Sequence, residues 1–132
     1  IRNPIDRVYS HYQMFINAKE ISSRHGLINF LRYSYEVKNL YCQYYSGLIG
    51  ENVDERIFKI ALENLKNFKA IINFNNYNSD LNKFLKEMGV KELKEENFHD
   101  NKISKNINSS SETEAIKLYN YWDLKLYEEI TK

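Results

Sequence analysis

An arginine, a serine and a predicted helix start lie close together at the beginning of the chain. Arg2 stands directly before Asn3-Pro4, and Ser10 follows about two helical turns later. A guanidinium offers phosphate a planar fork of donors, a serine hydroxyl adds another, and amides at a helix start contribute partial positive charge. This combination predicts an anion-binding site. The spacing alone also fits a plain capped helix with a surface arginine and a solvent-facing serine.

A helix from Pro4 to about Lys19 is expected to position both side chains. Asn3 is a good N-cap, Pro4 suits the first helical position, and Asp6 falls in the first turn, near the positive end of the helix dipole. Apolar residues then recur at steps of three and four, as one buried face requires. They are Ile5, Val8, Tyr9, Tyr12, Phe15 and Ile16.

The rest of the chain reads as further helices with one strand. We expect helices over residues 27–37 and 39–46, from Asp54 onward, from Asn78 or Ser79 to Met88, and from the capping box at Ser111 to the end. Residues 68–74 are partly β-branched and bounded by Asn-rich turn chemistry, so they predict a strand, and Ile1 is a candidate end of a second strand. Residues 94–110 are polar without a period and predict a long loop.

Composition limits the classes of protein but does not select a function. The 132 residues carry a formal net charge of +1, so no global electrostatic argument points to nucleic acid or an anionic membrane. The single cysteine, Cys42, excludes an intrachain disulfide and favours a cytoplasmic location. No apolar run approaches the roughly 20 residues that span a bilayer, so no membrane anchor is visible.

Other chemistries receive less support from the residues. His11, His25 and His99 are far apart, and Cys42 is not at metal-ligand spacing from any of them, so no metal site is expected. Ser10 and His11 are adjacent, and adjacent helical residues point about 100° apart, which disfavours a nucleophilic pair. The 11 tyrosines fall mostly on apolar faces and fit core packing better than base stacking, so no nucleic-acid partner is expected.

The segment Arg2-Asn3-Pro4-Ile5-Asp6-Arg7-Val8-Tyr9-Ser10-His11-Tyr12 resembles the 3'-phosphate-binding motif of sulfotransferases that use 3'-phosphoadenosine 5'-phosphosulfate (PAPS). Weaker similarity to carbohydrate sulfotransferases runs downstream, through residues 39–47, 62–89 and 101–128. The resemblance implies that residues 1–132 form the C-terminal part of a single sulfotransferase-like domain. It also implies an α/β architecture, a three-layer sandwich like that of P-loop nucleotide hydrolases, of which the visible chain supplies mostly helices and one or two short strands.

The resemblance also implies roles for particular residues. Arg2 and Ser10 would hold the 3'-phosphate of PAPS, and of the product adenosine 3',5'-bisphosphate. Arg7 would be structural and brace the helix. Lys102 and Lys105 would reach cofactor phosphates from the loop at 94–110, for which the alternative is a solvated turn. The reaction would be sulfuryl transfer from PAPS to a hydroxyl acceptor, for which we expect a glycan.

The departures from the family pattern matter equally. In these sulfotransferases the Gly-rich loop that wraps the 5'-phosphosulfate and the catalytic base both lie upstream of the motif, and this chain contains neither. We therefore expect an enzyme only in the intact form, with this chain alone inactive. A Golgi or membrane-anchored location stays open if further residues precede Ile1. The alternatives are an inactive nucleotide-binding homologue and a helical interaction domain.

Overall fold

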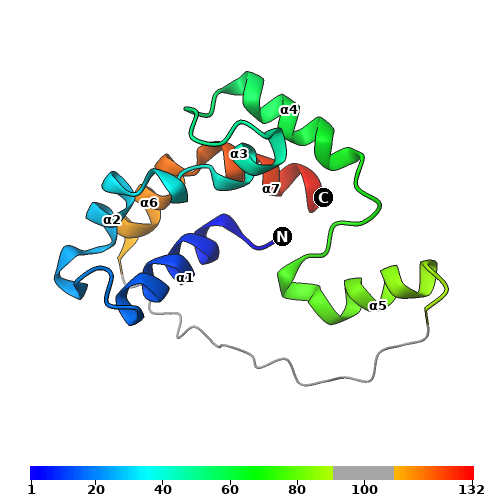
Figure 1. The fold of residues 1–132 in the computed structure, drawn as a ribbon, viewed down its shortest axis with the longest axis horizontal. Helices are drawn as coiled ribbons and strands as arrows, with labels where there is room; N and C mark the ends of the chain where they lie inside the picture. The colour runs from blue at the N-terminus through cyan, green and yellow to red at the C-terminus, as the bar shows by residue number, and fades with distance from the viewer. Residues whose placement is uncertain (91–108) are drawn as a thin grey trace.

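A computed structural model of the protein describes residues 1–90 and 109–132. Every secondary-structure element in these two ranges is a helix (Figure 1). The α-helices are α1 (Pro4–Asn17), α2 (Leu27–Tyr33), α3 (Leu40–Ser46), α4 (Glu55–Lys66), α5 (Tyr77–Glu87), α6 (Ser110–Tyr119) and α7 (Tyr121–Ile130). Three short 3₁₀ helices, η1 (Ser23–His25), η2 (Tyr35–Val37) and η3 (Phe74–Asn76), lie between them.

The expected α/β fold class is wrong for the described part of the chain. Residues 1–90 and 109–132 contain no strand, so they show a small all-helical domain and no three-layer P-loop-like sandwich. The predicted strand at 68–74 consists of bends, irregular backbone and the start of η3. The segment does not form a strand because its backbone makes too few hydrogen bonds with a neighbouring segment. The amino group of Ile1 donates to the carbonyl of Ile72, and the N–H of Phe74 donates to the carbonyl of Ile1 at 2.6 Å.

These two bonds have the pattern of a single parallel bridge, in which Ile1 faces Asn73. A strand requires a ladder of such bonds with a neighbour, and within the described residues Ile1 is the only partner distant in sequence whose backbone bonds to the backbone of this segment. The β-branched residues therefore serve packing instead. Ile71, for example, lies against the core that α3, α4 and α7 share.

Two apolar clusters form the interior. The first joins α1, α2, η2 and α6, and the second joins α3, α4 and α7. In Figure 1, α6 and α7 follow each other end to end alongside α2 and α3, so that one continuous stretch of chain contributes to both clusters. The fully buried members of the first are Val8, Leu27, Phe30, Leu31, Val37 and Ile116, and those of the second are Cys42, Ile57, Ala61, Leu65 and Leu126.

Local capping signals predict several helix boundaries well. α1 begins at Pro4 and α4 follows Asp54, whose carboxylate accepts the N–H of Ile57 at 2.9 Å. α5 begins at Tyr77, one or two residues before the predicted start. The N-cap of α6 is Ser109 instead of Ser111, because the Ser109 hydroxyl accepts the N–H of Glu112.

The last predicted helix is divided at Asn120, where α6 ends and α7 begins. Asn120 is fully buried, and its φ of −124° and ψ of 29° depart from helical values. The side chain takes part in a polar network described below. The bonds of the Asn120 side chain therefore interrupt the helix, although the apolar period of the sequence predicts a continuous one.

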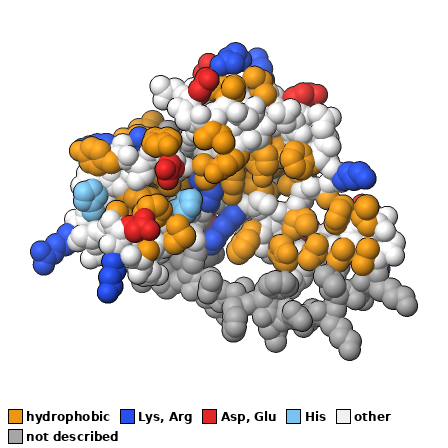
Figure 2. Space-filling view, viewed as in Figure 1, with side chains coloured by type: hydrophobic (Ala, Val, Ile, Leu, Met, Phe, Trp, Pro, Cys, Tyr) orange, Lys and Arg blue, Asp and Glu red, His pale blue; other side chains and the backbone are white. Residues whose placement is uncertain are grey.

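Helix α5 stands apart from the two clusters (Figure 1). None of its residues is buried, although Leu81, Phe84, Leu85 and Met88 fall on one face as the sequence predicts. Figure 2 shows hydrophobic side chains gathered over this part of the surface. Met88 is 52% exposed, which is unusual for the apolar face of an amphipathic helix.

Candidate functional site

The start of α1 has the capped geometry that the sequence predicts. The Oδ1 atom of Asn3 accepts the N–H of Ile5 at 2.9 Å, Pro4 occupies the first helical turn, and Asp6 follows in the same turn. Asn3 is the N-cap of α1, with a non-helical backbone conformation (φ −52°, ψ 129°), so Arg2 lies just outside the start of the helix.

Arg2 is held by contacts to two distant segments. The hydroxyl of Tyr41, on α3, accepts the backbone N–H of Arg2 at 3.2 Å and donates to the backbone carbonyl of Arg2 at 3.0 Å. The guanidinium of Arg2 lies over the ring of Phe74, 4.7 Å from the ring centroid. Arg2 is half-buried, so its donors stay within reach of solvent or a ligand.

Ser10 lies on α1, four residues after Asp6 and hence on the same helix face. It is partly exposed, as a ligand-binding hydroxyl must be. The structure thus places Arg2 and Ser10 at the start and the middle of one helix. Lys102 and Lys105, the two other predicted phosphate-binding residues, lie outside the described residues.

Arg7 has a different environment from Arg2, although both belong to the predicted motif. Its side chain is only 9% exposed. The Nη2 atom donates to the Val37 carbonyl at 3.0 Å, to Asn120 Oδ1 at 2.8 Å and to Asp123 Oδ2 at 3.3 Å. Its guanidinium also faces the ring of Tyr41, 4.9 Å from the centroid. Arg7 is thus a structural residue that ties α1 to η2 and α7.

Asp123 is the centre of the buried polar network and has no exposed surface. Besides Arg7, its carboxylate accepts the backbone N–H of Tyr41 at 2.9 Å and of Cys42 at 2.8 Å. These two amides belong to the first turn of α3, where backbone N–H groups lack partners within the helix. Asp123 therefore binds an arginine and a helix N-terminus together.

Asn39 connects the same network to the start of α7. Its Oδ1 atom accepts the N–H of Trp122 at 2.9 Å and of Asp123 at 3.1 Å. Its own N–H donates to Asn120 Oδ1 at 3.0 Å. Asn39 adopts the left-handed conformation, with φ 46° and ψ 43°, which asparagine tolerates better than most residues.

Sequence reasoning missed this network. The available signal was Asp123, which lies four residues after Tyr119 and three before Leu126 and therefore falls on the apolar face of the last predicted helix. A carboxylate on such a face indicates a buried partner, because an unpaired buried charge is costly. The sequence does not say that the partner is Arg7.

Burial shifts the acid–base behaviour of the groups around the network. Desolvation lowers the pKa of Arg7, and Asp123 opposes that shift. Desolvation raises the pKa of Asp123, while Arg7 and the amides of Cys42 and Tyr41 favour its charged form. Burial also lowers the pKa of His11, and the nearby charge of Arg7 lowers it further. The His11 ring packs edge-on against the ring of Phe15, with 6.2 Å between the ring centroids.

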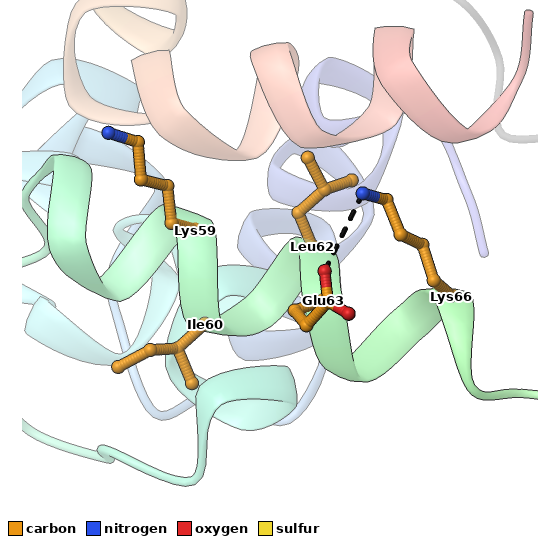
Figure 3. A pocket seen from close by; sticks show the side chains of 5 residues that line it. All are labelled: Lys59, Ile60, Leu62, Glu63 and Lys66. Carbon is orange, nitrogen blue, oxygen red and sulfur yellow. Dashed lines mark ion pairs between the residues drawn. The ribbon is translucent and has the colours of Figure 1, made fainter.

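A shallow hollow lies on the surface of α4 (Figure 3). The residues that line it are Lys59, Ile60, Leu62, Glu63 and Lys66. Lys66 pairs with Glu63 at 3.6 Å, and Lys59 pairs with Glu55 at 2.8 Å. Since both ammonium groups already face carboxylates of the same helix, this hollow offers an anion no uncompensated charge.

Residues 1–90 and 109–132 offer neither a metal site nor a membrane span. No group of at least three His, Cys, Asp or Glu side chains in these ranges could hold a metal ion. None of the helices there is both long enough and apolar enough to cross a bilayer.

Comparisons with protein-family models, with curated proteins and with solved structures found no match to this chain. The resemblance to PAPS-dependent sulfotransferases therefore rests on the amino-acid sequence alone.

Proposed function

We propose that the chain supplies the 3'-phosphate-binding part of a PAPS-dependent sulfotransferase, with Arg2 and Ser10 as the phosphate-binding residues. The observation that carries the proposal is the contrast between the two arginines of the motif. Arg7 is buried and paired with Asp123, whereas Arg2 lies half-exposed beside the helix start. Of the two, Arg2 is the one whose guanidinium can form a bidentate contact with phosphate.

The buried network supports this assignment because it fixes the position of α1. A phosphate site built from a helix start and one arginine gains affinity when the protein holds both in place before the ligand binds. Arg7 joins α1 to η2 and α7, and Tyr41 holds the backbone of Arg2. The backbone that carries both donors is thus held in place before the ligand binds, which lowers the conformational freedom lost on binding.

In the proposed reaction, these residues orient the donor and take no proton. Sulfuryl transfer from PAPS to a hydroxyl would depend on positioning and charge stabilisation, as phosphoryl transfer does. We expect a glycan acceptor. Lys102 and Lys105 are proposed as further contacts to cofactor phosphates. In the enzymes that the motif resembles, the catalytic base lies upstream of it, so we propose that this part of the chain binds the donor and does not supply the base.

The deciding experiment is calorimetric titration of the full-length protein with adenosine 3',5'-bisphosphate and with adenosine 5'-monophosphate. These ligands differ only at the 3'-phosphate. We expect the bisphosphate to bind at least about tenfold more tightly, and we expect Arg2→Ala to abolish that preference, because a charge-assisted hydrogen bond contributes about 1.5–3 kcal/mol. Arg24→Ala, which removes an equally charged but exposed side chain on η1, is the matched control.

Ser10→Ala should lower the preference by a smaller factor, since it removes one uncharged donor. Ser79→Ala, on the exposed surface of α5, is its control. Equal binding of the two nucleotides by the wild type would exclude the 3'-phosphate site. A preference for the bisphosphate without transfer of sulfate from PAPS to any acceptor would favour the inactive nucleotide-binding homologue.

The second candidate function is a helical interaction domain. The specific observation in its favour is α5, whose apolar face is not buried by the described residues. This function predicts that Arg2→Ala changes no nucleotide affinity, so the same titration separates the two candidates.

A further inference from the structure

One side chain connects the proposed phosphate-binding arginine to the buried network. The hydroxyl of Tyr41 accepts the N–H of Arg2 at 3.2 Å and donates to the carbonyl of the same residue at 3.0 Å. Both polar groups of one backbone unit are therefore satisfied by a single hydroxyl that lies 39 positions away in the sequence. This pairing fixes the backbone of Arg2 at a point where no helical hydrogen bonds do so.

Tyr41 is itself held firmly. Its backbone N–H donates to Asp123 Oδ2 at 2.9 Å, and its ring lies against the guanidinium of Arg7, 4.9 Å from the centroid. Burial raises the pKa of the Tyr41 phenol, so the hydroxyl keeps its proton at neutral pH and can donate and accept at once. Tyr41 thus transmits the fixed position of the Arg7–Asp123 pair to Arg2.

The orientation of the Arg2 side chain depends on these two hydrogen bonds, because its other contact is weak. Phe74 lies under the guanidinium at 4.7 Å, but its own ring is 56% exposed. A stacking contact with an exposed ring is weak, on the order of 0.5–1 kcal/mol. It also leaves the guanidinium free to rotate in the plane parallel to the ring. The two hydrogen bonds to Tyr41 fix the direction in which the Arg2 side chain leaves the backbone.

We propose that Tyr41 is a positioning residue for 3'-phosphate recognition, which acts by holding the backbone of Arg2 so that its guanidinium faces the phosphate. The inference rests on the proposed function, because it requires Arg2 to be the phosphate-binding residue. Tyr41 touches no ligand in this mechanism. Its contribution is to lower the conformational freedom that Arg2 loses on binding.

The test is Tyr41→Phe in the full-length protein, titrated with adenosine 3',5'-bisphosphate and adenosine 5'-monophosphate. Phe keeps the ring that packs against Arg7 and removes only the hydroxyl. We expect the preference for the bisphosphate to fall roughly three- to tenfold, as loss of one or two hydrogen bonds predicts, with the monophosphate affinity unchanged. Tyr45→Phe removes a half-buried hydroxyl one turn later on α3 and should leave the preference intact.

The outcomes separate the inference from the proposed function. If the wild type does not distinguish the two nucleotides, the proposed function fails and this inference fails with it. If the wild type prefers the bisphosphate, Arg2→Ala abolishes the preference and Tyr41→Phe keeps it, only the positioning role is overturned. Equal weakening of both ligands in Tyr41→Phe also overturns it, since a general structural role would affect both.

Thermal melting of each variant checks that it is folded. Should Tyr41→Phe be unfolded, 4-aminophenylalanine at position 41 provides a second variant, because its amino group keeps a donor for the Arg2 carbonyl. That protein should retain part of the preference for the bisphosphate. Complete loss of the preference in this folded variant would contradict the proposed role of the hydrogen bond to the carbonyl.

Discussion

Arg7 Nη2 lies 3.3 Å from Asp123 Oδ2, although 116 positions separate the two residues in the sequence. Both side chains are buried, and the carboxylate also accepts two backbone amides from α3. The pair therefore joins the first helix, the third helix and the last helix at one point. Its energetic role can be tested by removing one partner at a time.

Arg7→Met should destabilise the protein by about 3–5 kcal/mol, because it leaves the Asp123 carboxylate buried without its counter-ion. The free energy of unfolding, measured by urea denaturation, provides the check. Lys59→Met breaks an exposed pair on α4 and should change stability far less. A loss of under about 1 kcal/mol for Arg7→Met would mean that the buried pair does not hold α1 in place.

Asn39 provides a second test of the network, because its backbone conformation and its side chain contribute separately. Asn39→Gly keeps the left-handed conformation and loses the bonds to Trp122 and Asp123, at a cost of about 1–2 kcal/mol. Asn39→Ala loses the same bonds and adds about 1 kcal/mol of backbone strain.

The measurement is the difference between these two variants in the free energy of unfolding. The Gly variant should be the more stable of the two. An Ala variant that is equally stable or more stable would show that the left-handed conformation at position 39 is not maintained in solution.

The thiol of Cys42 should be chemically inert in the folded protein. It is fully buried, and burial raises its pKa well above the ordinary value, with the nearby charge of Asp123 acting in the same direction. We expect a disulfide reagent to modify Cys42 only after the protein unfolds, with a rate that follows the unfolded fraction.

An exposed thiol introduced by Ser23→Cys on η1 is the matched control and should react at once. Rapid modification of Cys42 without denaturant would require local opening between α3 and α4, and would contradict the packing of the second cluster.

Stability should fall as the pH drops below about 6.5, the ordinary pKa of histidine. Burial and the charge of Arg7 lower the pKa of His11 in the folded state, while Glu36 opposes the shift. Between the folded and unfolded pKa values the unfolded chain binds the additional proton, so protonation favours unfolding and stability rises with pH.

His11→Gln should flatten this part of the stability profile, measured by urea denaturation between pH 5 and 7.5 at roughly half-unit steps. His25→Gln, which removes an exposed histidine, should leave the profile as it is in the wild type. An unchanged slope in the His11 variant would assign the pH dependence to other groups.

The helices with local signals were the predictable part of the fold. α1 and α4 carry an N-cap side chain and an apolar period within their own residues, and both begin where the sequence indicates. The predicted strand at 68–74 is wrong because a strand depends on a neighbouring strand. Among the described residues, Ile1 is the only residue distant in sequence whose backbone bonds to the backbone of this segment.

The candidate site was predictable only in part, for a similar reason. Arg2 and Ser10 belong to one short motif, and the residue types in that motif predict an anion-binding site. Tyr41 and Asp123 bond to that motif from 39 and 116 positions away, and Asn39 in turn bonds to Asp123. Contacts at such distances leave no periodic trace in the sequence. The division at Asn120 has the same origin, because its side chain bonds to Arg7 and Asn39.

The contact between α1 and α7 also affects how the protein folds while it is being synthesised. During synthesis α1 leaves the ribosome before α6 and α7, so the carboxylate that neutralises Arg7 and the side chain of Ile116, which completes the first cluster, are made only later. Until then a nascent chain would hold an unpaired guanidinium against an unfinished apolar surface. We therefore expect this part of the chain to remain sensitive to proteases, and dependent on chaperones, until α7 has been translated.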